Sequence, residues 1–159
     1  MARARAAWQW GMALAGLLLA AWGPPALAVG GGGEPPRDAA RAPRWPVAAA
    51  EILAEVNRVR ASLGLGSLRA SPDLDEIASA HSRDMAARRR PSHDGFESRL
   101  DRTGASLCVE NVAAGFTAAA PLVAAWHAAP AHRRNLYEPR VSRVGIGSID
   151  RFVTLFACD

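Results

Sequence analysis

Residues 125–136 bring together the residue types that could form a ligand-binding or reactive site. This stretch holds Trp126, two of the four histidines, His127 and His132, and several polar side chains. Pro130 lacks a backbone N–H and clashes with a helix that runs into it, so the helix carrying Trp126 is expected to end there. His132 is then expected on the following turn, where its imidazole could point into a cleft lined by other loops.

Cys108 and Cys158 are the two cysteines of the chain. In an oxidising compartment an even number of cysteines favours a disulfide. This one would close a loop of about 50 residues and stabilise the fold by roughly 4 kcal/mol if chain entropy alone counts. The alternative is that Cys108 is a nucleophile beside a histidine, which requires a thiol that stays reduced outside the cytosol.

Two further groups of polar residues are interpreted as structural. Ser92, His93 and Asp94 are adjacent in the chain and cannot form a catalytic triad with one another, because triad members converge in space. His81 lies on the apolar face of a predicted helix. We interpret it as a hydrogen-bonded core histidine in preference to a ligand.

The first 28 residues have the pattern of a secretory signal peptide. A basic start precedes the apolar residues 8–22, and residues 26–28 form a small-x-small cleavage site. A retained membrane anchor is the alternative, but Pro24 and Pro25 stop the apolar run short of the roughly 20 residues that span a bilayer. We therefore expect a secreted or periplasmic protein that contacts the membrane only through an uncleaved signal segment.

The rest of the chain divides into a linker and one domain. Residues 29–45 are rich in Gly, Pro and Ala and predict a flexible linker. Residues 46–159 are long enough for a single domain with one hydrophobic core. Without residues 1–28 the chain has 17 arginines, no lysine and 15 acidic residues, a net charge of +2. This small charge predicts no nucleic-acid partner.

The apolar periodicity predicts an α+β fold in which helices precede a C-terminal hairpin. The predicted helices cover residues 47–63, 71–89, 97–103 and 118–129, and the predicted strands cover residues 107–109, 141–149 and 152–157. Asp150 and Arg151 form the predicted turn of an antiparallel hairpin. Glu110, which follows the first strand, is interpreted as a turn or helix-start acceptor of backbone N–H groups.

Six short motifs then carry a resemblance to a known family. They are EVNRVR at 55–60, HSRDMA at 81–86, SHDGF at 92–96, ENVAAG at 110–115, AW with PAHRRNL within 125–136, and VGIG at 144–147. In these motifs and their order, the chain resembles the CAP superfamily (SCP domain) of cysteine-rich secretory, antigen 5 and pathogenesis-related proteins, and is most similar to its short bacterial members. The resemblance covers nearly all of residues 47–157. It implies an α-β-α sandwich with a small antiparallel sheet flanked by helices.

The resemblance also implies a central cleft, which in animal and plant members holds two histidines and two glutamates. By motif match, His93 and His132 correspond to the histidines and Glu110 to the first glutamate. The second glutamate is replaced by Ala129, so a triad is expected in place of the tetrad.

Three neighbours of this cleft, Ser92, Arg99 and Asn135, could orient a ligand. The alternative is that Asn135 caps a turn and Arg99 lies on the surface. Two imidazoles and one carboxylate could bind zinc or another divalent metal and leave one position open for water or substrate. Without a metal, ionised Glu110 would hydrogen-bond one or both imidazoles and raise their pKa. We favour the metal-free cluster, which requires no cofactor.

Three functions fit this chain. The first is a secreted, non-enzymatic module that binds a small lipid or cell-envelope ligand, because the resemblance implies lipid and sterol binding for some relatives. The second is a metal-dependent, peptidase-like hydrolase that uses His93, Glu110 and His132, with Glu110 as general base, although no nucleophile is apparent. The third is an interaction or stability domain attached to the envelope. We expect the first, in a monomeric protein.

Overall fold

The computed structural model describes residues 45–159, so the predicted signal peptide and the linker up to residue 44 lie outside the described residues. The helices are α1 (Ala49–Ser62), α2 (Pro72–Arg88), α3 (Phe96–Thr103), α4 (Ala119–Ala128) and α5 (Pro130–Leu136). The strands are β1 (Arg69–Ala70), β2 (Cys108–Ala114), β3 (Arg143–Ile149) and β4 (Phe152–Cys158). Among the described residues, no helix has the length and apolar character needed to cross a membrane.

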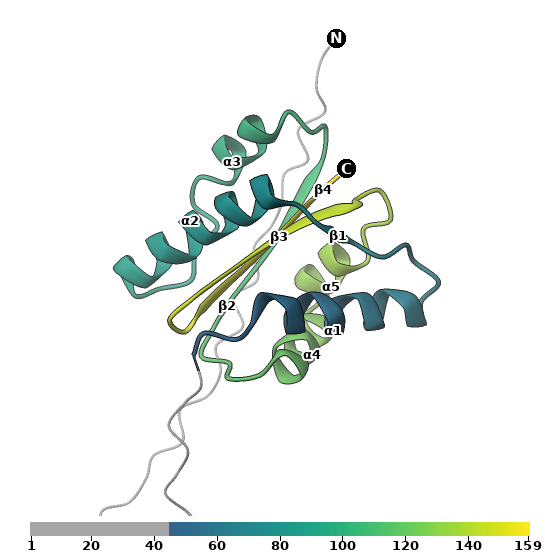
Figure 1. Ribbon diagram of the computed structural model, residues 1–159, viewed down its shortest axis with the longest axis horizontal. Helices are drawn as coiled ribbons and strands as arrows, with labels where there is room; N and C mark the ends of the chain where they lie inside the picture. The colour runs from purple at the N-terminus through teal and green to yellow at the C-terminus, as the bar shows by residue number, and fades with distance from the viewer. Residues whose placement is uncertain (1–44) are drawn as a thin grey trace, which may run out of the picture. The chain divides into compact units, whose positions relative to one another are not determined.

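The four strands form one sheet in the order β1-β3-β4-β2 (Figure 1). Strand β4 pairs antiparallel with both β3 and β2, while the two-residue strand β1 pairs parallel with β3. Helices α2 and α3 cover one face of the sheet, and α1, α4 and α5 cover the other (Figure 1). The predicted α-β-α sandwich is therefore confirmed. Its sheet is mixed, because the parallel strand β1 adds to the predicted antiparallel pairing.

Side chains alternate across the sheet and fill a core on each face. In β4, Val153 and Leu155 pack with Trp126 of α4, whereas Phe156 packs with Leu74 of α2. Trp126 is 1% exposed and its indole N–H donates to the carbonyl of Val112 at 3.2 Å. This tryptophan fixes α4 to the sheet.

Two expectations about local structure are wrong in ways that affect the candidate site. Glu110 lies inside β2, not in a turn, because β2 continues to Ala114 and pairs with β4 over its whole length. His132 lies in α5, not on a turn. Pro130 ends the preceding helix and also starts this one, since the first helical position needs no N–H partner.

The predicted disulfide joins Cys108 and Cys158, which pair across β2 and β4 with their Cα atoms 4.1 Å apart. The described residues contain no free cysteine. The alternative interpretation of Cys108 as a nucleophile is therefore wrong, because its sulfur is in the covalent bond.

Helix α2 lies unusually close to β3. A Cβ atom built on Gly145 would lie 2.0 Å from the carbonyl carbon of Leu74, and one on Gly147 would lie 2.3 Å from the carbonyl oxygen of Ala78. Ser82 of α2 uses this proximity, since its hydroxyl donates to the Gly147 carbonyl at 2.9 Å. The absence of side chains at the two glycines therefore sets the spacing between helix and sheet.

Candidate functional site

Glu110 is the centre of the candidate site. It lies on β2, an outer strand of the sheet, and its side chain is 1% exposed. Strand alternation directs Glu110 toward the layer of α2 and α3 and its neighbour Asn111 toward α5. Residues from both helical layers therefore meet at this edge of the sheet.

Arg99 of α3 holds the Glu110 carboxylate with a two-pronged hydrogen bond. Its Nε donates to Oε2 and its Nη2 donates to Oε1, each at 2.8 Å. The remaining Nη1 donates to the carbonyl of Asp94 at 2.8 Å. Arg99 is buried. It therefore belongs to the cluster, and the alternative that places it on the surface is wrong.

His93 is fixed by the same carboxylate. Its Nδ1 lies 2.9 Å from Glu110 Oε1. Because that carboxylate oxygen acts as an acceptor, as it does toward Arg99, we assign the hydrogen of this bond to Nδ1 of His93. The His93 side chain is 19% exposed, whereas that of Glu110 is 1% exposed. The buried ion pair thus orients an imidazole that reaches the surface.

His81 of α2 lies behind this pair. Its Nε2 lies 2.7 Å from the carbonyl of Ser92 and 3.7 Å from Glu110 Oε1. The pKa of His81 is lowered, mainly by burial. The charge of Glu110 opposes this shift, whereas Arg99 and His93 add to it. The interpretation of His81 as a hydrogen-bonded core histidine is confirmed.

Ser92 organises the loop before His93. Its hydroxyl accepts the backbone N–H of Asp94 at 2.9 Å, and its own N–H donates to Sδ of Met85 at 3.4 Å. These contacts, together with the bond from His81, fix the backbone on either side of His93. They support a positioning role for Ser92.

His132 approaches the edge of β2 from the α5 side. The Asn111 amide donates to the His132 carbonyl at 3.0 Å, and the Asn135 amide donates to the Glu110 carbonyl at 2.8 Å and to Asn111 Oδ1 at 2.9 Å. Asn135 thus ties α5 to β2 and does not cap a turn. Asn111 was not singled out in the sequence. The apolar residues that continue after Glu110 could have indicated Asn111, because they show that the strand runs on past it.

Burial lowers the pKa of His132, and the neighbouring His93 lowers it further. The sequence left open whether Glu110 hydrogen-bonds one or both imidazoles. The carboxylate bonds His93 and Arg99, and the pKa of His132 is lowered, not raised. His93 and His132 are both partly exposed imidazoles, and they come from different elements of the fold. Glu110 bonds the imidazole of His93, and the backbone carbonyl of His132 accepts from Asn111, the next residue along β2.

The arrangement of these residues does not favour the zinc site that the sequence offered as the alternative to a metal-free cluster. The described residues contain no group of three or more His, Cys, Asp and Glu side chains placed to hold a metal ion. Both oxygens of Glu110 are already bonded to Arg99. A metal ligated by Glu110 would have to displace the guanidinium.

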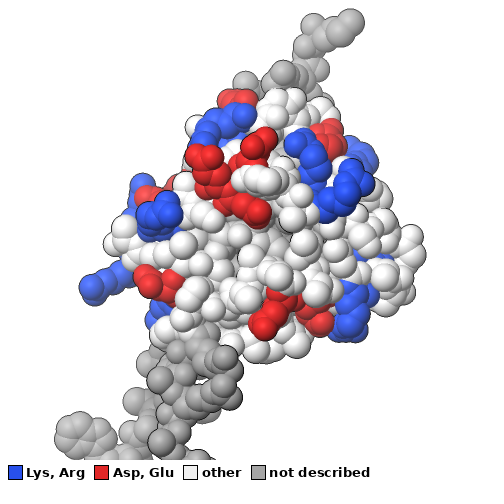
Figure 2. All heavy atoms as spheres, viewed as in Figure 1, with Lys and Arg blue, Asp and Glu red and all other residues white. Residues whose placement is uncertain are grey.

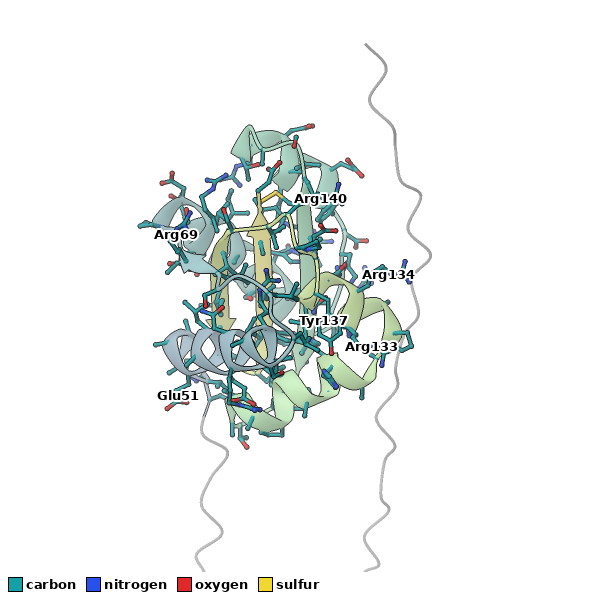
Figure 3. All side chains as sticks on the ribbon, turned by 90° about the vertical axis from the view of Figure 1, so that its right-hand side faces the viewer. Glu51, Arg69, Arg133, Arg134, Tyr137 and Arg140 are labelled. Atoms are coloured by element: carbon teal, nitrogen blue, oxygen red, sulfur yellow. A yellow bond between two sulfur atoms is a disulfide. The ribbon has the colours of Figure 1, made fainter. Side chains whose placement is uncertain are left out.

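The remaining polar residues of the stretch 125–136 point elsewhere. Arg133 and Arg134 are exposed, and Figure 3 shows both on the outer side of α5. His127 is exposed, and its Nδ1 shares a 2.6 Å hydrogen bond with the Tyr137 hydroxyl. His127 is thus outside the site.

Comparison with known proteins is consistent with this fold. Residues 53–151 match the sequence model of the cysteine-rich secretory protein family, CAP. No curated protein matches the chain.

Among solved structures, an extracellular protein containing an SCP domain from Bacillus anthracis is 28% identical, with a TM-score of 0.65, and the match covers 69% of this chain and 39% of that one. A cysteine-rich secretory protein from Staphylococcus aureus is 21% identical (TM-score 0.63), covering 69% of this chain and 37% of that one. An outer surface protein from Borrelia burgdorferi is 24% identical (TM-score 0.60), covering 67% and 89%. The chain thus spans about two fifths of the length of the first two.

Proposed function

Because the chain belongs to the cysteine-rich secretory protein (CAP) family, which it matches over residues 53–151, we propose that it is an exported binding module. In this proposal His93 and His132 contact a small lipid or another cell-envelope molecule of a bacterium. The protein acts as a monomer and needs no cofactor.

The rigid presentation of His93 carries the proposal. This imidazole is partly exposed, yet its Nδ1 is fixed at 2.9 Å from a carboxylate that is itself buried and held by Arg99. Such support from neighbouring residues is what a preorganised binding site requires. His132 is the second imidazole of the proposed site; it is partly exposed, and His93 contributes to the lowering of its pKa. The pair can hydrogen-bond the polar group of a ligand.

Two observations support export and a ligand that is not nucleic acid. Two of the similar structures are an extracellular and an outer surface protein, in agreement with the predicted signal peptide. Figure 2 shows arginine and acidic side chains intermixed over the face in view, where a nucleic-acid site needs one gathered basic patch.

Nothing observed favours the hydrolase alternative. A peptidase-like mechanism would need Glu110 as a general base, but its carboxylate is engaged by Arg99 and His93. The described cysteines form a disulfide, so they supply no thiol nucleophile. A binding role uses the oriented imidazoles and needs neither a free general base nor a thiol nucleophile.

Amide NMR titrations test the proposed function. The probes are a short-chain phosphatidylcholine below its micelle concentration and soluble peptidoglycan fragments. We expect saturable shifts around His93 and His132 with at least one probe, and about tenfold weaker binding in His93→Ala and His132→Ala after loss of a ligand hydrogen bond. His127→Ala is the matched control, because it removes an exposed imidazole outside the site. The proposal fails if neither probe gives saturable shifts, or if the control weakens binding equally.

A further inference from the structure

We propose that Arg99 is the built-in cation of this site. Its guanidinium takes the position beside Glu110 that a divalent metal would need, and through Glu110 it positions His93. The inference rests on the proposed function in treating His93 as a ligand-contacting group. Its test needs no knowledge of the ligand.

Each of the three nitrogens of the Arg99 guanidinium donates a hydrogen bond. Nε and Nη2 bond the two Glu110 oxygens, and Nη1 bonds the Asp94 carbonyl, each at 2.8 Å. Asp94 lies in the loop that also carries His93. The guanidinium therefore links α3, β2 and this loop, and its place is determined by three separate contacts.

The charge of Glu110 explains why a cation must stand there. A carboxylate with a 1% exposed side chain is costly to bury unless a positive charge and hydrogen bonds compensate it. A metal ion can supply that charge, and here Arg99 supplies it. Zinc at the same place would push the buried guanidinium of Arg99 away from the Glu110 carboxylate.

The same contact sets the orientation of His93. With Glu110 held by Arg99, Oε1 stays 2.9 Å from Nδ1 of His93 and keeps the hydrogen on that nitrogen. A zinc ion bound by Glu110 would break or weaken this bond. The Nδ1 proton is thus a direct reporter of whether arginine or metal neutralises the carboxylate.

Zinc affinity, measured by competition with a chromophoric chelator, tests the inference in four proteins. These are wild type, Glu110→Gln, Arg99→Met and the double variant, each first checked for folding by circular dichroism. We expect wild type and Glu110→Gln to have the same zinc affinity within about twofold, because Glu110 is not a ligand. Arg99→Met, which leaves Glu110 without its cation, should bind zinc about tenfold more tightly, and the double variant should lose this gain.

A measurement on wild type alone keeps the inference testable if the variants do not fold. NMR of the imidazole nitrogens should show His93 protonated at Nδ1, with the same signal after addition of equimolar zinc. Loss of that signal with zinc would overturn the inference, as would a tenfold loss of zinc affinity in Glu110→Gln or an absent gain in Arg99→Met. Binding of the lipid or peptidoglycan probes is a separate observation, so failure of the proposed function is distinguishable from failure of this inference.

Discussion

At the scale of single residues, the most consequential contact is the buried ion pair of Arg99 and Glu110. Removing one partner of such a pair leaves an uncompensated charge inside the protein, which costs far more than losing an exposed pair. The cluster around this pair includes His81 and His93. The stability of the fold therefore depends on the charges within this cluster.

Arg99→Met should lower the free energy of unfolding by about 3–5 kcal/mol, because Glu110 loses its buried counter-charge. Urea denaturation measures the change. The matched control is Arg140→Ala: Arg140 bonds Glu138 at 2.7 Å but has a 68% exposed side chain. This control should cost much less, because an exposed ion pair is screened by solvent. Equal losses in the two variants would contradict the buried-pair account.

Acid should weaken the fold through His81 and His132. Their folded-state pKa values lie below the ordinary value of 6.5, so the unfolded chain takes up protons first as the pH falls. Their contribution is present above about pH 6.5 and is lost as the pH falls toward the lower folded pKa values. Unfolding free energies from about pH 7.5 to about pH 5 should therefore decrease. The decrease should be smaller in His81→Asn than in His127→Asn, and identical slopes would rule out this explanation.

The sequence identified the candidate residues unequally well. The resemblance to the CAP family selected His93, Glu110 and His132, because the motifs that carry them occur in the family's order along the chain. The partner of Arg99 could not be predicted, since it depends on how α3 docks against β2, eleven residues further on. The same applies to Asn135, whose amide reaches β2 from α5.

At the scale of elements, the contact between α2 and β3 is the tightest described above. The glycines at 145 and 147 allow it, and Ser82 bonds both the Gly147 carbonyl and the Thr154 hydroxyl across it. His81 lies next to Ser82 on the same helix. The position of α2 therefore affects both the core and the back of the candidate site.

Gly147→Ala should destabilise the domain by about 1–3 kcal/mol, because its new methyl group would overlap the α2 backbone at Ala78 and Ser79. Gly66→Ala is the control, since no atom lies within 4 Å of a Cβ built there. Thermal unfolding of the two variants gives the comparison. A melting temperature for Gly147→Ala that equals that of Gly66→Ala would show that α2 does not depend on this close approach.

Helix boundaries were predictable where the local chemistry determines them. Ser71 and Pro72 at the start of α2 gave its first turn, and the hairpin turn at Asp150 and Arg151 lies as expected. The length of β2 was not predictable, because buried polar residues interrupt its apolar pattern and only pairing with β4 reveals it. That error placed Glu110 in a turn.

At the scale of the whole domain, the disulfide joins the start of β2 to the end of β4, across a sequence separation of 50 residues. The double variant Cys108→Ala/Cys158→Ala should lose about 2–5 kcal/mol of stability, because the unfolded chain gains conformational entropy without the cross-link. Urea unfolding with and without reductant measures this. Reductant should lower the stability of wild type and leave that of the double variant unchanged. A wild type that is indifferent to reductant would refute the contribution.

The central position of β4 has a consequence for the order of events during synthesis and export. This strand follows every other element of the domain in sequence, yet it lies between β3 and β2 and pairs with each along seven residues. Domains fold as units during synthesis, and here β2 has no strand to pair with until β4 has emerged. A growing chain therefore cannot complete its sheet until the domain is almost entirely made. For a protein expected to thread through a membrane pore, this late closure keeps the chain in a form that the pore can accept.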